Sequence, residues 1–188
     1  MDSTRVLVVD NGSLSAHLLC SRLADLGVDV GLVGSQEVPR VLPSGTRAMV
    51  LSGTGVPADE GSYRRLEDTV SRCAVPVLGV CGGMQILGVM QGGRLVRGVQ
   101  RVGAHEVRVD ASEQLFSSVP GTVSLFQRHT RYLTDVPEQF RVIGRSATCA
   151  VEFIRSRDGR LFGSQAHLEF RSDGISILRG FLDLALRW

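Results

Sequence analysis

Apolar residues in the first half of the chain form short continuous runs that alternate with stretches of helical periodicity. The runs cover residues 5–10, 28–33, 47–51 and 75–80, and such runs are typical of strands buried on both faces of a parallel sheet. Leucines recur at helical spacing across residues 14–26, and residues 58–72 follow the third run as a polar helix. This alternation predicts a mostly parallel sheet with helices on both faces and a ligand site beyond the carboxyl ends of the strands.

After Gly93 the pattern changes to short β-rich segments separated by turns. The segments cover residues 94–96, 105–109, 122–126, 140–143, 149–154 and 161–165, and an Asp-Gly pair between the last two is a strong hairpin signal. Residues 174–186 close the chain as an amphipathic helix. Because no repeat or long linker divides the sequence, we expect residues 1–188 to form one three-layer α/β domain. Its open twisted sheet, of flavodoxin-like type, carries a smaller antiparallel extension.

The amino-acid composition excludes more kinds of catalytic site than the net charge does. All 21 basic residues are arginine and none is lysine, which excludes a Schiff-base lysine and a P-loop lysine from this chain. The formal net charge of +2 indicates neither nucleic acid nor a membrane as a partner. The four cysteines lie far apart without metal-ligand spacing, and the sequence has neither a signal-peptide pattern nor an apolar run of about 18 residues. We therefore expect a cytoplasmic protein without a metal site.

Residues 76–85 join a buried strand to a cysteine flanked by glycines. We interpret Cys81 as a nucleophile at the apex of a sharp strand-to-helix turn, a nucleophile elbow. Gly79 and Gly83, two residues to either side, would let the strand and the helix approach closely, and the helix N-terminus would favour the thiolate. The alternative is a buried structural cysteine beside a glycine-rich turn.

A cysteine nucleophile needs a base, and four histidines are available. His17 falls in the first predicted helix and His105 opens a predicted strand, so both fit a surface or satisfied polar role better than a catalytic one. His129 lies between Arg128 and Arg131, whose charges would disfavour a protonated ring.

His167 is the better candidate for the base. It follows the predicted strand at residues 161–165, and Glu169 lies two residues further on, so that both side chains would point to one side of an extended segment. Glu169 could then accept the ring N–H and orient the imidazole. The alternative is an exposed polar pair at the end of a strand.

Together these motifs resemble the class I, or triad, glutamine amidotransferases, a family with an elbow of the form G-x-C-x-G-x-Q and a downstream F-H-P-E. Here the elbow reads GVCGGMQ at residues 79–85, and the downstream motif reads GSQAHLE at residues 163–169. The likeness covers nearly the whole chain. Residues 136–149 look most like the glutaminase part of GMP synthase, with the anthranilate and aminodeoxychorismate synthase glutaminases next.

The resemblance implies that Cys81 attacks the side-chain amide of glutamine, forms a γ-glutamyl thioester and releases ammonia. His167 would act as general acid and base, and Glu169 would orient it. The other implied site residues are Gly82, Gly53 and Thr54, whose backbone would form the oxyanion hole, and Gln85, Gln127, Arg128 and His129, which would contact the substrate.

Two positions near the predicted oxyanion hole depart from the family pattern. Gly82 stands where the family usually has leucine, and Thr54 stands where it usually has glycine. Because a side chain resists a positive φ angle, we expect Thr54 to aim its N–H correctly only when a partner is bound.

The resemblance also implies a separate synthetase subunit that receives the ammonia. An ATP-pyrophosphatase type is favoured, with ATP and magnesium held there and no cofactor on this chain. Other hypotheses stay open at this point. One is the glutaminase of a different biosynthetic amidotransferase, such as an anthranilate or aminodeoxychorismate synthase or an enzyme of a specialised pathway. The others are a hydrolase of γ-glutamyl compounds without a partner and a weakly active binding subunit.

Overall fold

The computed structural model describes residues 5–188, which form nine strands, four α-helices and one short 3-10 helix. In chain order the elements are β1 (Arg5–Asn11), α1 (Ala16–Asp25), β2 (Asp29–Gly34), β3 (Thr46–Thr54), α2 (Arg64–Arg72), β4 (Val77–Val80), α3 (Gly82–Met90), β5 (Arg94–Val109), η1 (Gln114–Phe116), β6 (Thr122–Asp135), β7 (Phe140–Arg145), β8 (Phe153–Ser156), β9 (Leu161–Ser164) and α4 (Ser172–Arg187).

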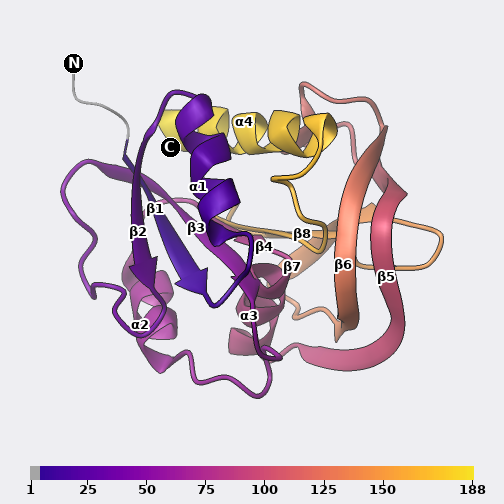
Figure 1. The fold of residues 1–188 in the computed structure, drawn as a ribbon, viewed down its shortest axis with the longest axis horizontal. Coiled ribbons are helices and arrows are strands. Elements are labelled where there is room, and N and C mark those ends of the chain that lie inside the picture. Colours follow the sequence, from indigo (N-terminus) through magenta and orange to yellow (C-terminus); the bar gives the residue numbers. More distant parts are fainter. Residues whose placement is uncertain (1–4) are drawn as a thin grey trace.

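All of these strands belong to one sheet, with the order β2-β1-β3-β4-β9-β8-β7-β5-β6. The strands from β2 to β9 in this order pair in parallel, whereas β8, β7, β5 and β6 form an antiparallel extension. The β5–β6 hairpin forms one side of the molecule in Figure 1, and its strands of 16 and 14 residues are longer than any strand that the sequence predicts. The predicted parallel sheet with an antiparallel extension is confirmed.

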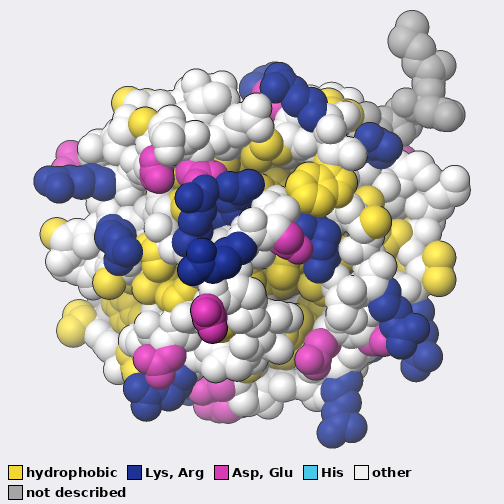
Figure 2. All heavy atoms as spheres, turned by 180° about the vertical axis from the view of Figure 1, so that it is seen from behind, with side chains coloured by type: hydrophobic (Ala, Val, Ile, Leu, Met, Phe, Trp, Pro, Cys, Tyr) yellow, Lys and Arg dark blue, Asp and Glu magenta, His cyan; other side chains and the backbone are white. Residues whose placement is uncertain are grey.

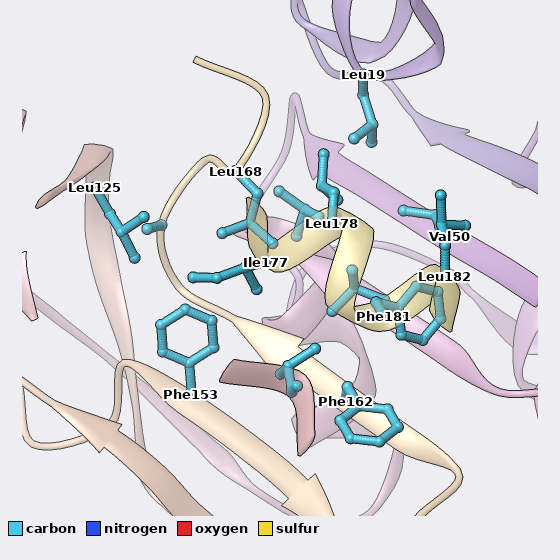
Figure 3. Close-up of a cluster of buried hydrophobic side chains, with 14 of the residues drawn as sticks. Leu19, Val50, Leu125, Phe153, Phe162, Leu168, Ile177, Leu178, Phe181 and Leu182 are labelled. Carbon is cyan, nitrogen blue, oxygen red and sulfur yellow. The ribbon is translucent and has the colours of Figure 1, made fainter. Parts of the chain in front are cut away.

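Helices cover both faces of the parallel part of the sheet (Figure 1). In β1, Val6 and Val8 pack into a core with residues of α1 and α4, whereas Leu7 and Val9 pack into a second core with residues of α2 and α3. Figure 3 shows the first of these cores, in which side chains of α4 meet those of the sheet. Burial on both faces explains why the parallel strands read as continuous apolar runs.

On the face seen in Figure 2, basic and acidic side chains are interleaved, with hydrophobic side chains between them. This face therefore carries no large patch of a single charge. None of the helices within residues 5–188 is both long and apolar enough to cross a lipid bilayer.

The second helix is shorter than residues 58–72, the range that the sequence predicts. It does not begin until Arg64, because the chain first turns at Pro57, whose carbonyl accepts the N–H of Gly61 at 3.1 Å. The sequence also predicts Leu14 in a helix, but this residue precedes α1 and is 89% exposed. Both errors extend a helix into a loop at the carboxyl edge of the sheet.

The sequence predicts separate strands at residues 94–96 and 105–109, but both segments belong to β5. The register of β5 against β6 shifts between Arg97 and Arg101, and such an irregularity breaks the alternation of side chains without ending the strand. Of residues 149–154, only the last two lie in a strand, β8. The Asp-Gly hairpin between β8 and β9 is confirmed.

Candidate active site

Cys81 occupies the turn between β4 and α3 in a strained backbone conformation. Its φ and ψ angles are 52° and −106°, and among residues 5–188 it is the only residue other than glycine with a positive φ. The backbone of a non-glycine residue is costly to hold in this region, and such strain concentrates at functional sites. The elbow that the sequence predicts is therefore present, with Cys81 buried at its apex.

The two glycines that flank Cys81 are both required by close packing. A Cβ on Gly79 would lie 2.4 Å from the carbonyl carbon of Gly83, and a Cβ on Gly83 would lie 2.4 Å from the carbonyl oxygen of Leu51. The predicted close approach of strand and helix is confirmed.

His167 and Glu169 form a buried pair beside the elbow. His167 Nδ1 donates to Glu169 Oε1 at 2.7 Å, and the two residues are 7% and 1% exposed, which excludes the alternative of an exposed polar pair. The pair lies just beyond β9, and the backbone N–H of His167 bonds to the carbonyl of Phe126 in β6 at 2.8 Å. The histidine is thus held by backbone and side chain together.

The pKa of His167 reflects these contacts. Burial disfavours the imidazolium, but hydrogen bonding to Cys81 and Glu169 outweighs burial and raises the pKa of His167 to about 10. Since Nδ1 is bonded to Glu169, Nε2 is the nitrogen left for Cys81. The histidine is therefore positively charged at neutral pH.

The predicted oxyanion residues come together at the end of β3. Thr54 is the last residue of this strand, Gly82 is the first of α3, and a Cβ on Gly53 would lie 3.5 Å from His167 Cε1. Thr54 continues β3 in extended conformation and has no positive φ, so the conflict between its side chain and a positive φ angle does not arise. The orientation of the Thr54 N–H consequently needs no strained backbone conformation.

Gln85 is buried beneath the elbow with its amide bonded to protein groups. Its Nε2 donates to the carbonyl of Arg131 at 2.9 Å and to Gln165 Oε1 at 3.1 Å. Gln165 in turn places its amide nitrogen 3.8 Å from Cys81 Sγ. The contact of Gln85 with substrate stays a prediction. In the structure, the Gln85 side chain links α3 to β6 through its hydrogen bond to the carbonyl of Arg131.

The segment 127–129 reaches the elbow through its backbone. The carbonyl of Arg128 lies 4.0 Å from Cys81 Sγ, while the side chains of Gln127 and His129 bond to each other at 2.9 Å. A role of this backbone in holding the substrate stays a prediction, since the side chains of Gln127 and His129 are committed to buried hydrogen bonds.

His129 is a neutral histidine at pH 7. Burial, with a further contribution from Arg101, lowers its pKa to about 4 despite the opposing charge of Glu152. From the sequence, the charges of Arg128 and Arg131 are expected to lower the pKa of His129. In the structure the pKa is lowered, but the largest cause is burial.

Three residues in the surroundings of the site are not found from the sequence. Ser15 donates its hydroxyl to Glu169 at 2.6 Å, Gln165 approaches Cys81, and the fully buried Glu152 accepts from Gln127 at 2.8 Å. Of these three residues, only Ser15 could have been indicated by the sequence. It lies in the loop after β1, and β1 ends at the same edge of the sheet as the elbow.

Comparison with known proteins supports the interpretation of the motifs. The family model described as "Glutamine amidotransferase class-I" matches residues 7–183. The GMP synthase (glutamine-hydrolyzing) of Streptococcus mutans is 30% identical over 96% of this chain but only 36% of its own length. A protein of Pyrococcus abyssi that is named as one subunit of a GMP synthase (glutamine-hydrolyzing) is 25% identical over 95% of this chain and 97% of its own length. The chain thus spans about a third of the first relative and nearly all of the second.

Solved structures share the fold over nearly all of the chain. A protein from Thermoplasma acidophilum that is described as a "putative gmp synthase subunit a protein" superposes with a TM-score of 0.89 at 27% identity, covering 98% of this chain and 95% of that one. The PurLQS structure from Thermotoga maritima has a TM-score of 0.81 at 16% identity, covering 97% of this chain and 99% of that one, and at this identity it shows the fold alone. With a family match over residues 7–183, the chain belongs to the class-I glutamine amidotransferase family.

Proposed function

We propose that this chain is the glutaminase subunit of a two-component amidotransferase of the GMP synthase type. It hydrolyses the side-chain amide of glutamine and delivers the ammonia to a separate synthetase subunit. The observation that carries this proposal is the arrangement of a strained cysteine at a helix start beside a buried histidine whose Nδ1 is bonded to a carboxylate.

The reaction begins with the thiolate of Cys81, which attacks the amide carbon of glutamine. The resulting tetrahedral species carries its negative charge on oxygen, next to the backbone N–H groups of Gly82 and Thr54, and each such donor contributes about 10²–10³-fold in rate. His167 Nε2 gives its proton to the amide nitrogen, and ammonia leaves as the thioester forms.

Hydrolysis of the thioester uses the same groups in reverse. His167, now neutral, takes a proton from a water molecule that attacks the thioester carbon, and glutamate leaves as the sulfur regains its negative charge. Glu169 keeps Nδ1 protonated through both steps, so that Nε2 is always the nitrogen that exchanges protons with the reacting atoms.

A separate synthetase is supported by the relatives. The Pyrococcus abyssi protein that matches this chain over nearly its full length is named as one subunit of GMP synthase, and the longer GMP synthases extend well beyond the matched part. We favour a synthetase of the ATP-pyrophosphatase type, which would hold ATP and magnesium and adenylate the acceptor of the ammonia.

Glutamate release from glutamine tests this proposal, on the chain alone and with the candidate synthetase. We expect release by the wild type in the complex and a loss of at least about 10³-fold for Cys81→Ala. No release in either state would indicate the binding-subunit alternative. Release without any co-purifying synthetase, together with turnover of other γ-glutamyl compounds, would indicate the hydrolase.

A further inference from the structure

Gly82 and Thr54 lie so close together that no side chain fits between them. A Cβ on Gly82 would lie 2.4 Å from Thr54 Cγ2 and 2.5 Å from Thr54 N, well inside normal contact distance. The side chain of Thr54, together with its backbone nitrogen, therefore fills the space that a larger residue at position 82 would need. The two positions are coupled sterically across the predicted oxyanion hole.

The peptide between Gly53 and Thr54 has a defined orientation. The carbonyl of Gly53 accepts the hydroxyl of Ser52 at 2.9 Å, and no peptide bond within residues 5–188 is cis, so the N–H of Thr54 points the opposite way. The next N–H, of Gly55, bonds to Asn11 in β1 at 3.3 Å. Because successive N–H groups of a strand point to opposite sides, the N–H of Thr54 faces β4 and the elbow.

The hydroxyl of Thr54 secures the end of β3 in this position. It donates to the carbonyl of Val56 at 2.7 Å and, since a hydroxyl has one proton, it accepts from the N–H of Val56 at 3.2 Å and from the hydroxyl of Tyr63 at 3.1 Å. Tyr63 directly precedes α2. The strand end is thus tied to the start of a packed helix.

We propose that the side chain of Thr54 is a positioning group of the oxyanion hole, matched to the glycine at position 82. Its methyl group packs against the elbow and its hydroxyl ties the strand end to Tyr63, so that the Thr54 N–H is held toward the elbow without a partner protein. This inference rests on the proposed function for its catalytic consequence. Its steric part is independent of activity.

Enzyme kinetics test the positioning role, on the isolated chain and on its complex with the synthetase. Thr54→Val keeps the methyl shape and removes the hydroxyl, and Tyr63→Phe removes only the partner hydroxyl. Because an oxyanion donor acts in the transition state, we expect each to lower kcat for glutamine hydrolysis about tenfold with KM changed less than about twofold. Thr54→Ser, which keeps the hydroxyl, should retain kcat within about threefold.

Thermal unfolding tests the steric match without reference to activity. Gly82→Ala should lower Tm by roughly 4–10 °C when Thr54 is present, because the added methyl group overpacks the contact. In a Thr54→Gly background the same change should lower Tm by less, because the contacts with the Thr54 side chain are removed and only the contact with the backbone nitrogen remains. Gly121→Ala is the matched control, since a Cβ there meets nothing within 4 Å, and it should leave kcat and Tm unchanged.

The outcomes separate the two proposals. Additive effects of Gly82→Ala and Thr54→Gly on Tm would overturn the steric match. Wild-type kcat in both Thr54→Val and Tyr63→Phe, in an active enzyme, would overturn the positioning role. If the wild type releases no glutamate even with its synthetase, the proposed function fails and the positioning role fails with it, while the unfolding experiment still decides the steric match.

Discussion

Ser15 and Glu169 are 154 positions apart in the sequence, yet the Ser15 hydroxyl donates to Glu169 Oε1 at 2.6 Å. The same oxygen accepts the Nδ1–H of His167 at 2.7 Å, and the other oxygen, Oε2, is buried with no hydrogen bond among the residues that the structure describes. Ser15 therefore fixes the rotation of the carboxylate that orients the histidine. It extends the Cys81, His167 and Glu169 arrangement by one hydrogen bond, from the loop after β1.

Removal of this hydroxyl should weaken catalysis without weakening substrate binding. In Ser15→Ala the carboxylate loses one of its two partners, a change of about 0.5–1.5 kcal/mol, and we expect kcat for glutamine hydrolysis to fall about three- to tenfold with little change in KM. Ser15→Thr keeps the hydroxyl and should restore most of kcat. A fall in kcat that Ser15→Thr shares equally would indicate a packing effect instead.

The pKa of His167 predicts a pH-dependent stability. Its folded value of about 10 exceeds the unfolded value of about 6.5, so the folded state binds the proton more tightly. The stabilisation is complete below pH 6.5 and is lost as the pH rises through 10, by roughly 2–5 kcal/mol in the free energy of unfolding. Urea unfolding at a series of pH values measures this loss.

The chain has no lysine, but burial raises the pKa values of the Cys20, Cys73 and Cys149 thiols above their ordinary value of 9.0, so these groups also lower stability above about pH 9. The contribution of His167 is therefore measured below pH 9. His167→Asn removes the titrating ring and should flatten the dependence between pH 7 and 9. An unfolding free energy of the wild type that stays constant over this range would contradict the raised pKa.

The buried carboxylate of Glu152 should be strongly coupled to Arg101. Arg101 Nη1 donates to Glu152 Oε1 at 2.6 Å, and the two side chains are 6% and 0% exposed. Glu152→Ala leaves the guanidinium buried without its counter-charge, so we expect a loss of about 3–5 kcal/mol in the free energy of unfolding. The double variant Arg101→Met with Glu152→Met should lose less than the single variant. A double variant that is no more stable than Glu152→Ala would contradict this.

The elements near the elbow could be predicted from the sequence because their signals are local. The parallel strands are marked by apolar runs, and the elbow by glycines that fit only if strand and helix touch. The loop before α2 could not be placed, since Asp59 and Glu60 are polar in helix and loop alike. The single long β5 was hidden by the irregularity in its pairing with β6.

The surroundings of the site depend on contacts between distant segments. In the sequence Glu152 is an ordinary polar residue within the predicted strand at residues 149–154, and only the folded chain shows that it is fully buried and bonded to β5 and β6. The match between Thr54 and Gly82 could not be inferred either, because each position considered alone is only a departure from the family pattern. Such a match between two distant residues can be recognised only in the folded structure, where the sheet brings them together.

Arg131 should control the mobility of the loop at residues 55–63 beside the site. Its guanidinium contacts both carboxylate oxygens of Asp59 at 3.2 Å and Glu60 Oε1 at 2.7 Å. These side chains are partly exposed, so Arg131→Ala should lower the global unfolding free energy by no more than about 1 kcal/mol. Local opening of the loop should become easier by a similar amount, which is about fivefold faster amide hydrogen exchange within it.

A matched change on the same hairpin provides the control for this effect. Arg94→Ala removes an exposed ion pair with Asp135 at 2.8 Å, which joins β5 to β6 and not β6 to residues 55–63. It should leave exchange in that loop unchanged while costing a similar global free energy. Equal acceleration in both variants would show that the loop responds to general loosening of the hairpin. Acceleration in Arg131→Ala alone would show that Arg131 restrains the loop directly, through its contacts with Asp59 and Glu60.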